Sequence, residues 1–195
     1  MRLHRWWLYQ SFFDKEANEE MMKDPQKYAA FILRIIEKFV AITRFGALRQ
    51  DLKIFYYDAI VTLEDDPEKY KERKEFFDNV QERIPYCEVE LGDRVESKKK
   101  RFKQKRVDTL IAVDMITKAF LKHYEHAILL SGNRDFVSVV EAIKNYTGKR
   151  VTGIYEPESV ARDLELAYEN RKILPKNELF SIYEECFGYK QKHKE

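Results

Sequence analysis

Three aspartates and one asparagine are the residues of this sequence whose types and positions best suit chemistry. Asn133 and Asp135 lie in the segment SGNRDF, which follows a short run of apolar residues, and Asp108 and Asp114 lie in an apolar stretch earlier in the chain. Carboxylate oxygens suit Mg²⁺ and Mn²⁺, and an asparagine carbonyl can join them. Such ions activate water and stabilise the displacement of a phosphodiester oxygen. If these side chains meet in the fold, the sequence predicts a metal site for phosphodiester chemistry.

Each of these residues also has a simpler structural interpretation. Asn133, Asp135 and Asp108 stand where helices are predicted to begin, so they could serve only as helix caps. Asp114 has apolar neighbours on both sides, and a buried carboxylate is costly unless it is paired, hydrogen-bonded or metal-bound. Lys118, four residues later, could supply an ion pair within the helix. The sequence alone leaves both interpretations open.

A basic run precedes Asp108 directly. Residues 98–106, KKKRFKQKR, hold seven basic residues in nine. This run could bind a phosphate backbone and deliver it to the acids, while Phe102 stacks on a base; the alternative is a solvated loop that contacts nothing. The predicted nucleic-acid-binding residues are Lys98, Lys99, Lys100, Arg101, Phe102, Lys103, Lys105, Arg106, Ser131 and Arg134.

Short apolar runs alternate with amphipathic stretches along the chain, which predicts an α/β fold. Strands are expected at residues 52–59, 87–91, 127–130 and 151–155, and helices at 24–45, 67–84, 107–121, 136–146 and 157–168. This alternation favours a parallel sheet covered by helices. Functional residues in such sheets gather at the carboxyl ends of the strands, which draws attention to Asp58, residues 131–135 and Glu156.

Length and composition limit the classes of protein that fit. We expect the 195 residues to form a single domain (1–195): a helical part at 1–50, a core at 52–175, and a C-terminal helix with a basic tail at 176–195. The aromatic residues of this tail either pack on the core or join a homodimer. Two distant cysteines do not support a disulfide framework, and phosphate-binding glycine loops are absent from the sequence. Without a long apolar run or signal peptide, no membrane association and a cytoplasmic location are expected.

Several motifs in a fixed order resemble the NYN domain family, the LabA-like branch of the PIN-like nuclease superfamily. They are YYDA at 56–59, KRVD at 105–108, LIAVDM at 110–115, AILLSGNRDF at 127–136, GKRV at 148–151 and RDL at 162–164. The resemblance covers about residues 52–175. It implies a Rossmann-like, PIN-like three-layer sandwich with a mainly parallel central sheet. It also implies an acidic site for Mg²⁺ or Mn²⁺ that includes Asp108, Asp114 and Asp135, and hydrolysis of RNA.

The sequence departs from the family's pattern in two places. The first strand of the family usually ends in a metal-site aspartate that is followed three residues later by asparagine, whereas His4 and Trp7 stand there, and this strand is predicted to be truncated. The family's SGDxDF motif also carries Asn133 and Arg134 here.

Two functions therefore remain open. The first is a metal-dependent endoribonuclease in which Asp108, Asp114 and Asp135 hold the ion, Asn133 assists and water is the nucleophile. The alternative is a catalytically impaired NYN-like module that binds RNA or a protein partner.

Overall fold

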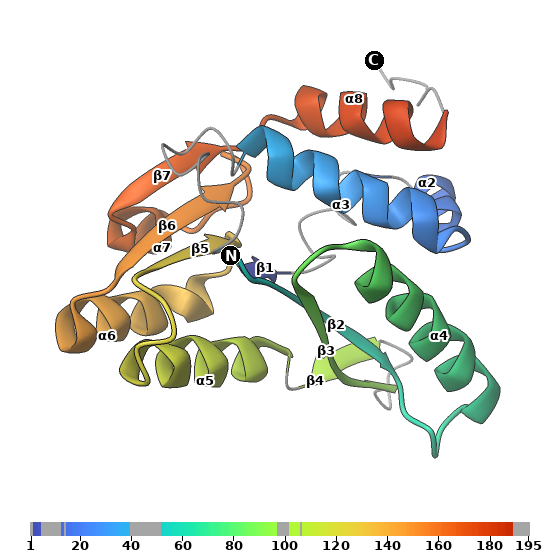
Figure 1. Ribbon diagram of the computed structural model, residues 1–195, viewed down its shortest axis with the longest axis horizontal. Coiled ribbons are helices and arrows are strands. Elements are labelled where there is room, and N and C mark those ends of the chain that lie inside the picture. Colours follow the sequence, from blue (N-terminus) through green and yellow to red (C-terminus); the bar gives the residue numbers. More distant parts are fainter. Residues whose placement is uncertain are drawn as a thin grey trace.

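One seven-stranded sheet organises the computed structural model, which describes residues 2–4, 13, 15–39, 52–96, 102–105 and 107–188. Its strand order is β4-β3-β2-β1-β5-β6-β7 (Figure 1). Neighbouring strands are parallel except β3 and β4, which run antiparallel. The strands are β1 (Arg2–His4), β2 (Ile54–Val61), β3 (Cys87–Glu96), β4 (Phe102–Lys105), β5 (His126–Leu130), β6 (Arg150–Tyr155) and β7 (Asn170–Ile173).

Helices cover both faces of the sheet. α3, α4 and α8 pack with one core cluster, and α5, α6 and α7 pack with the other. The predicted mainly parallel α/β sandwich is therefore confirmed. None of the helices in the described part of the chain combines the length and the apolar composition that crossing a membrane requires. The helices are α2 (Lys15–Met21), α3 (Pro25–Phe39), α4 (Pro67–Arg83), α5 (Val107–Phe120), α6 (Val137–Thr147), α7 (Arg162–Ala167) and α8 (Lys176–Phe187), with a short 3₁₀ helix, η2, at Arg134–Phe136.

Strand β2 shows why the sheet is buried on both faces. All eight of its residues are buried, and successive side chains point to opposite faces. Tyr56 joins the cluster beneath α3 and α4, whereas Phe55 and Tyr57 join the cluster beneath α5 and α6. A continuous run of branched and aromatic residues is typical of a parallel strand covered by helices on both sides.

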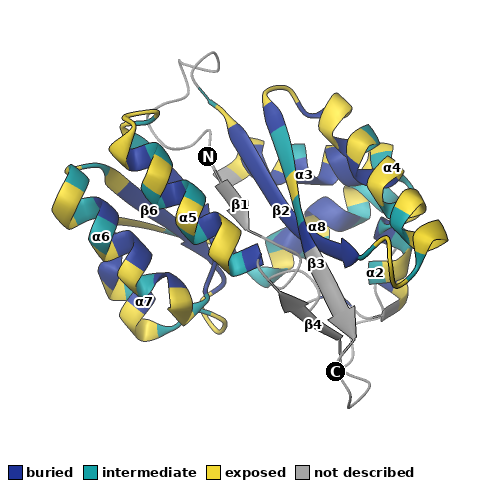
Figure 2. Cartoon of the chain, turned by 90° about the horizontal axis from the view of Figure 1, so that it is seen from below, coloured by how far each residue is buried: buried dark blue, intermediate teal, exposed yellow. Residues whose placement is uncertain are grey.

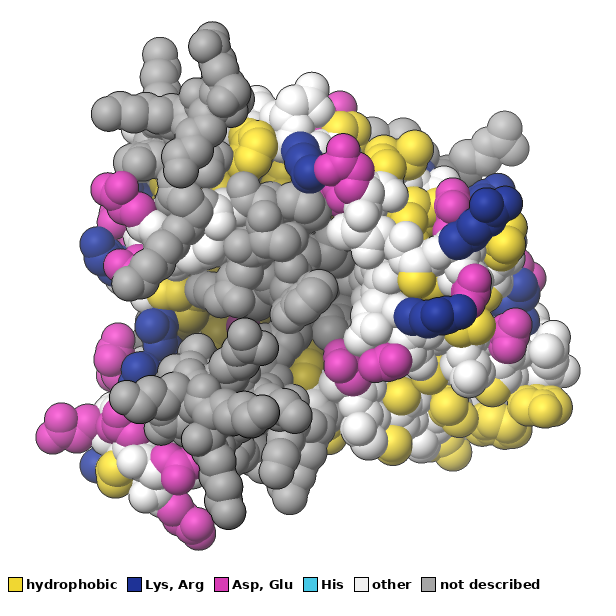
Figure 3. Space-filling view, turned by 180° about the vertical axis from the view of Figure 1, so that it is seen from behind, with side chains coloured by type: hydrophobic (Ala, Val, Ile, Leu, Met, Phe, Trp, Pro, Cys, Tyr) yellow, Lys and Arg dark blue, Asp and Glu magenta, His cyan; other side chains and the backbone are white. Residues whose placement is uncertain are grey.

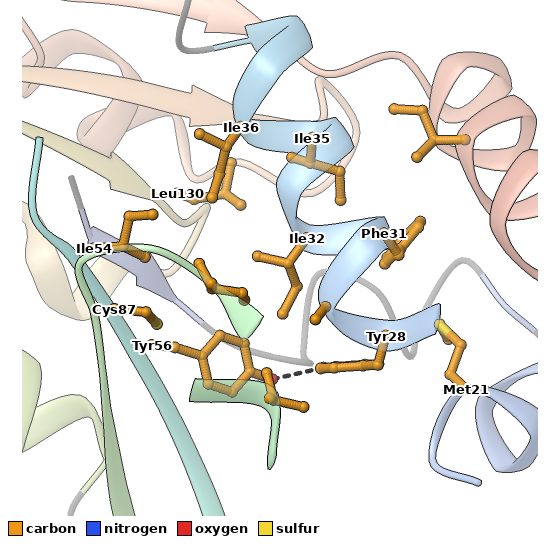
Figure 4. Packing of buried hydrophobic residues seen from close by; sticks show 14 of the residues in the cluster. Met21, Tyr28, Phe31, Ile32, Ile35, Ile36, Ile54, Tyr56, Cys87 and Leu130 are labelled. Carbon is orange, nitrogen blue, oxygen red and sulfur yellow. Dashed lines mark hydrogen bonds between the residues drawn. The ribbon is translucent and has the colours of Figure 1, made fainter. Parts of the chain in front are cut away.

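Helix α3 supplies much of the first cluster. Asp24 caps the helix, because its carboxylate accepts hydrogen bonds from the backbone N–H groups of Gln26 and Lys27 at 2.9 and 3.1 Å. Apolar residues then recur every three or four positions and face the sheet (Figure 4). Tyr28 extends from this helix to Tyr56 of β2, and the two hydroxyl oxygens lie 2.7 Å apart.

The first strand, expected to be truncated, is three residues long and pairs with β2 and β5 in the centre of the sheet. At three other elements the structure differs from the sequence-based expectations. Part of the basic run forms strand β4, and β7 was not predicted because it has a single apolar residue among four. The helix expected at 157–168 is shorter, because Ser159 N donates to the carbonyl of Glu156 in a turn that precedes α7.

Candidate acidic site

The turn after β5 brings Asn133 and Asp135 to the carboxyl end of the sheet. The side-chain oxygen of Asn133 accepts a hydrogen bond from the backbone N–H of Asp135 at 3.1 Å and so caps the 3₁₀ helix. The backbone N–H of Asn133 in turn donates to the Ser131 hydroxyl at 3.1 Å. The capping role considered from the sequence is thus present for Asn133. It also fixes the side-chain amide, which leaves the amide nitrogen directed at other groups.

That amide nitrogen lies near two carboxylates. Nδ2 of Asn133 is 3.4 Å from a carboxylate oxygen of Asp108 and 3.5 Å from one of Asp135. Asp108 is in the first turn of α5, so this helix begins beside the turn that carries Asp135. Backbone N–H groups in a first helical turn favour negative charge nearby, whether it comes from a carboxylate or a phosphate. The structure therefore brings together three of the four residues singled out from the sequence.

Gly132 allows a close backbone approach at this site. A Cβ atom on Gly132 would lie 2.5 Å from the carbonyl oxygen of Ser159, and the backbone N–H of Ala161 donates to the Gly132 carbonyl at 3.0 Å. The segment between β6 and α7 is therefore packed directly against the turn after β5. A side chain at position 132 would push the two segments apart.

Tyr168 holds the end of β5 from the side of α7. Its buried hydroxyl donates to the carbonyl of Ser131 at 3.1 Å, and its ring stacks on Tyr155 with centroids 6.0 Å apart. The ring covers Gly153 so closely that a Cβ there would lie 2.2 Å from a ring carbon. Neither Tyr168 nor Gly153 was singled out from the sequence. A glycine inside a predicted strand was the available signal, because it often marks such an approach.

Asp114 lies on a different flank of α5. Six residues along an α-helix are a rise of about 9 Å and a rotation of about 240°, so Asp108 and Asp114 do not share a face. The Asp114 carboxylate accepts a hydrogen bond from the Tyr57 hydroxyl at 2.6 Å and forms an ion pair with Lys118. The Lys118 ammonium also lies 4.4 Å from the centre of the Phe55 ring. The helical ion pair considered from the sequence is therefore present.

Asp58 belongs to a buried network on the opposite face of the sheet. It is inside β2 and 5% exposed, and its carboxylate accepts hydrogen bonds from the Tyr56 hydroxyl at 3.1 Å and from the backbone N–H of Ala59 at 2.7 Å. Burial raises the pKa of Tyr56, and the neighbouring Tyr28 and Asp58 raise it further. Because Tyr56 faces α3, Asp58 is directed away from Asp108 and serves the core.

Glu156 is the other buried acid at the carboxyl end of the sheet. It follows β6 directly and is 4% exposed. One carboxylate oxygen lies 3.8 Å from the Lys176 ammonium, and the other has no hydrogen-bond partner in the described structure. Because this atom is buried, it offers no ligand to an ion at the surface.

The donor set at Asp108 and Asp135 fits one kind of metal site. Mg²⁺ in proteins is usually held by one or two carboxylates and keeps several waters, with substrate phosphate completing its shell. Two carboxylates fixed around Asn133 suit that mode of binding. Within the described ranges, no group of three or more His, Cys, Asp or Glu side chains could hold a metal. The residues thus fit a hydrated ion rather than a closed cage.

The predicted nucleic-acid-binding residues are described only in part. Arg134 is exposed and forms an ion pair with Asp163 of α7, which ties the turn after β5 to that helix. Residues 102, 103 and 105 belong to edge strand β4, while residues 98–101 and 106 lie outside the described residues, as does Trp7. His4 ends the central strand β1 in register with Tyr57.

Comparisons with known proteins found a matching protein family and a similar solved structure. A family model described as the NYN domain matches residues 19–171. No curated protein matches the sequence of this chain. Among solved structures, the chain is similar to a protein of unknown function from Vibrio parahaemolyticus RIMD 2210633, with 19% sequence identity, a TM-score of 0.47, and coverage of 77% of this chain and 78% of the other.

Proposed function

The chain belongs to the NYN domain family, and on that premise we propose that it is a divalent-metal-dependent ribonuclease. NYN domains are a PIN-like, nuclease-type family, which supports a nuclease or RNA-related role in general. Nuclease domains of this family are generally dependent on divalent metals. For this chain we propose that it binds a divalent ion, that it cleaves RNA, and that the residues named below carry out both.

The observation that carries the proposal is the convergence of two carboxylates on one amide. Asp108 and Asp135 belong to different elements, yet both have an oxygen within 3.5 Å of the Asn133 amide nitrogen. We assign these two aspartates as ligands of Mg²⁺ or Mn²⁺. When bound, such an ion supplies an activated water and stabilises the oxygens of a phosphodiester displacement.

The chain's own residues position the ligands and the substrate. Asn133 orients both carboxylates and caps the turn that carries Asp135. The first turn of α5 directs N–H groups toward a phosphate beside Asp108. We assign the basic segment at 98–106, which directly precedes α5 in the sequence, to binding the phosphate backbone of RNA. Asp114 is left out of the ligand set, because its carboxylate is held by Tyr57 and Lys118.

Carboxylate-to-amide variants test the proposal. Purified wild-type protein should cleave a labelled single-stranded RNA when Mn²⁺ or Mg²⁺ is present and should stop when EDTA is added. Asp108→Asn and Asp135→Asn should each lower the rate by about a hundredfold or more, because each removes one of two ion ligands.

Glu125→Gln is the matched control for these variants. Glu125 is exposed, forms an ion pair with Lys149, and precedes β5 at the opposite end of the strand, so its variant should cleave at the wild-type rate. Equal cleavage by wild type and Asp108→Asn would mean that a contaminating nuclease is measured, and the proposal would then have no support.

One observation favours a second candidate function, an RNA-binding module without catalysis. The described residues hold two acids at the site rather than three, and each missing carboxylate weakens the affinity for a divalent ion. RNA binding without metal-dependent cleavage would support this candidate. Replacing Lys98, Lys99, Lys100 and Arg101 with alanine should then weaken binding and reduce its salt dependence, by about 0.7 in log–log slope for each phosphate that the variant no longer neutralises.

A further inference from the structure

Helix α5 has an outward face without a single charged residue. Its exposed large apolar side chains are Leu110 and Val113, 36% and 57% exposed, and at its C-terminal end Phe120 and Leu121, 55% and 59% exposed. The exposed threonines 109 and 117 complete this α5 stripe. Figure 2 views this helix from its outer side, and in Figure 3 hydrophobic side chains gather at the lower right, the corner of the molecule that α5 and α6 occupy.

This face differs from that of an ordinary surface helix. The exposed positions of α4 are mostly Lys, Glu and Asp, as solvated helices require. On α5 the charges nearest the stripe, Asp114 and Lys118, neutralise each other on one flank. A nucleic acid would gain nothing from a surface without basic groups, and a charged protein partner would find no opposite charge. The stripe suits another uncharged apolar surface.

The stripe is also symmetric about its own centre. Its six positions are 109, 110, 113, 117, 120 and 121, which are arranged evenly around Met115. If a second, antiparallel α5 crosses the first at the level of this buried residue, every stripe position faces a stripe position of the other copy. Leu110 then faces Phe120, and Val113 faces Thr117. Such self-matching of one patch is what a two-fold dimer interface requires.

The ends of the helix favour the antiparallel arrangement. Two antiparallel copies set the positive, N-terminal end of each helix dipole against the negative, C-terminal end of the other. The Asp108 side chain takes no part in this pairing, because it faces Asn133. A parallel pair would set like ends together. Both observations thus favour the same orientation.

We propose that the protein forms a two-fold dimer through the α5 stripe, with the two α5 helices antiparallel. The proposal rests on α5 alone and does not depend on catalysis. Asp108 points to the sheet side of the helix, toward Asn133, so dimerisation leaves the acidic site uncovered. A helix of this length is about 21 Å long and covers less than the roughly 800 Å² per partner of a standard interface, so we expect a weak, transient dimer.

Sedimentation velocity of the full chain over a concentration series tests the dimer. Wild type should shift from monomer to dimer through the micromolar range. Val113→Asp places a charge at the centre of the stripe and should raise the dissociation constant by about tenfold or more. Leu166→Asp is the matched control, because Leu166 is an equally exposed apolar residue on α7, 67% exposed, and should leave the constant unchanged.

Cross-linking tests the orientation. In a Cys186→Ser background, which removes the partly exposed native thiol, a mixture of Leu110→Cys and Phe120→Cys chains should form a mixed disulfide on mild oxidation. Neither variant alone should cross-link efficiently. A protein that stays monomeric at all concentrations, or a dimer unaffected by Val113→Asp, would overturn the proposal. A disulfide between two Leu110→Cys chains would overturn the antiparallel arrangement.

Discussion

Replacing Asp114 with alanine separates a structural role from a role in metal binding. Its carboxylate accepts a hydrogen bond from the Tyr57 hydroxyl at 2.6 Å, and Tyr57 is 1% exposed. Without the carboxylate, that hydroxyl loses this acceptor in the core, and the loss of a hydrogen bond to a charged group costs about 1.5–3 kcal/mol. The ion pair with Lys118 adds about 0.3–0.5 kcal/mol. We therefore expect the free energy of unfolding to fall by about 2–3 kcal/mol.

The assay is urea denaturation followed by circular dichroism, with wild type, Asp114→Ala, Tyr57→Phe and the double variant compared. Because the two side chains share one hydrogen bond, the double variant should lose less than the sum of the single losses, with a coupling of about 1–2 kcal/mol. RNA cleavage per folded molecule should stay within a few-fold of wild type. Full stability together with a complete loss of metal-dependent cleavage would refute this reasoning and restore Asp114 as an ion ligand.

Two further changes test the packing around the site, and a third tests the burial of Cys87 in the cluster beneath α3 and α4. Gly132→Ala should lower the free energy of unfolding by about 1–3 kcal/mol and should also slow RNA cleavage, because its Cβ would collide with the Ser159 carbonyl. Urea denaturation and cleavage assays measure the two effects. Wild-type values in both assays would contradict the close approach. Tyr168→Phe should cost about 1–2 kcal/mol in urea denaturation because it removes the hydrogen bond to Ser131, and an unchanged midpoint would argue against that bond. Burial raises the pKa of the Cys87 thiol to about 12 from a usual 9.0. As the pH rises, the thiol of the unfolded chain loses its proton before the thiol of the folded chain does, so the free energy of unfolding should fall between about pH 9 and 12. The fall should be smaller in Cys87→Ala, and an equal fall in the two proteins would contradict the pKa shift.

Much of the fold could be predicted because buried strands and amphipathic helices have periodic sequences. The apolar runs that became β2, β5 and β6 were found to within two residues at each end. Strand β7 was missed because an edge strand with polar residues carries little of this signal. The central strand β1 is three residues long, too short for any periodicity to show.

The candidate site was predicted less completely, since contacts between distant segments leave no local pattern. The motif around Asn133 marked a turn after a strand, and Asp108 marked a helix start, so both were found. Asp114 either joins the acidic site or pairs with Lys118 of its own helix. The six-residue offset from Asp108 and the hydrogen bond from Tyr57, a residue of strand β2, decide between these two positions. The sequence offered Lys118 as a partner but could not decide between the two interpretations.

Strand β1 has a consequence for the order in which the protein assembles. It lies between β2 and β5, and the strands on each side of it are joined by connections that are short in sequence. During synthesis the ribosome makes β1 before either neighbour, yet its second edge finds no partner until β5 has emerged. The two halves of the sheet can therefore form from local contacts, while their joining awaits the closure of a long loop. We expect β1 to dock late, after the two halves of the sheet have formed.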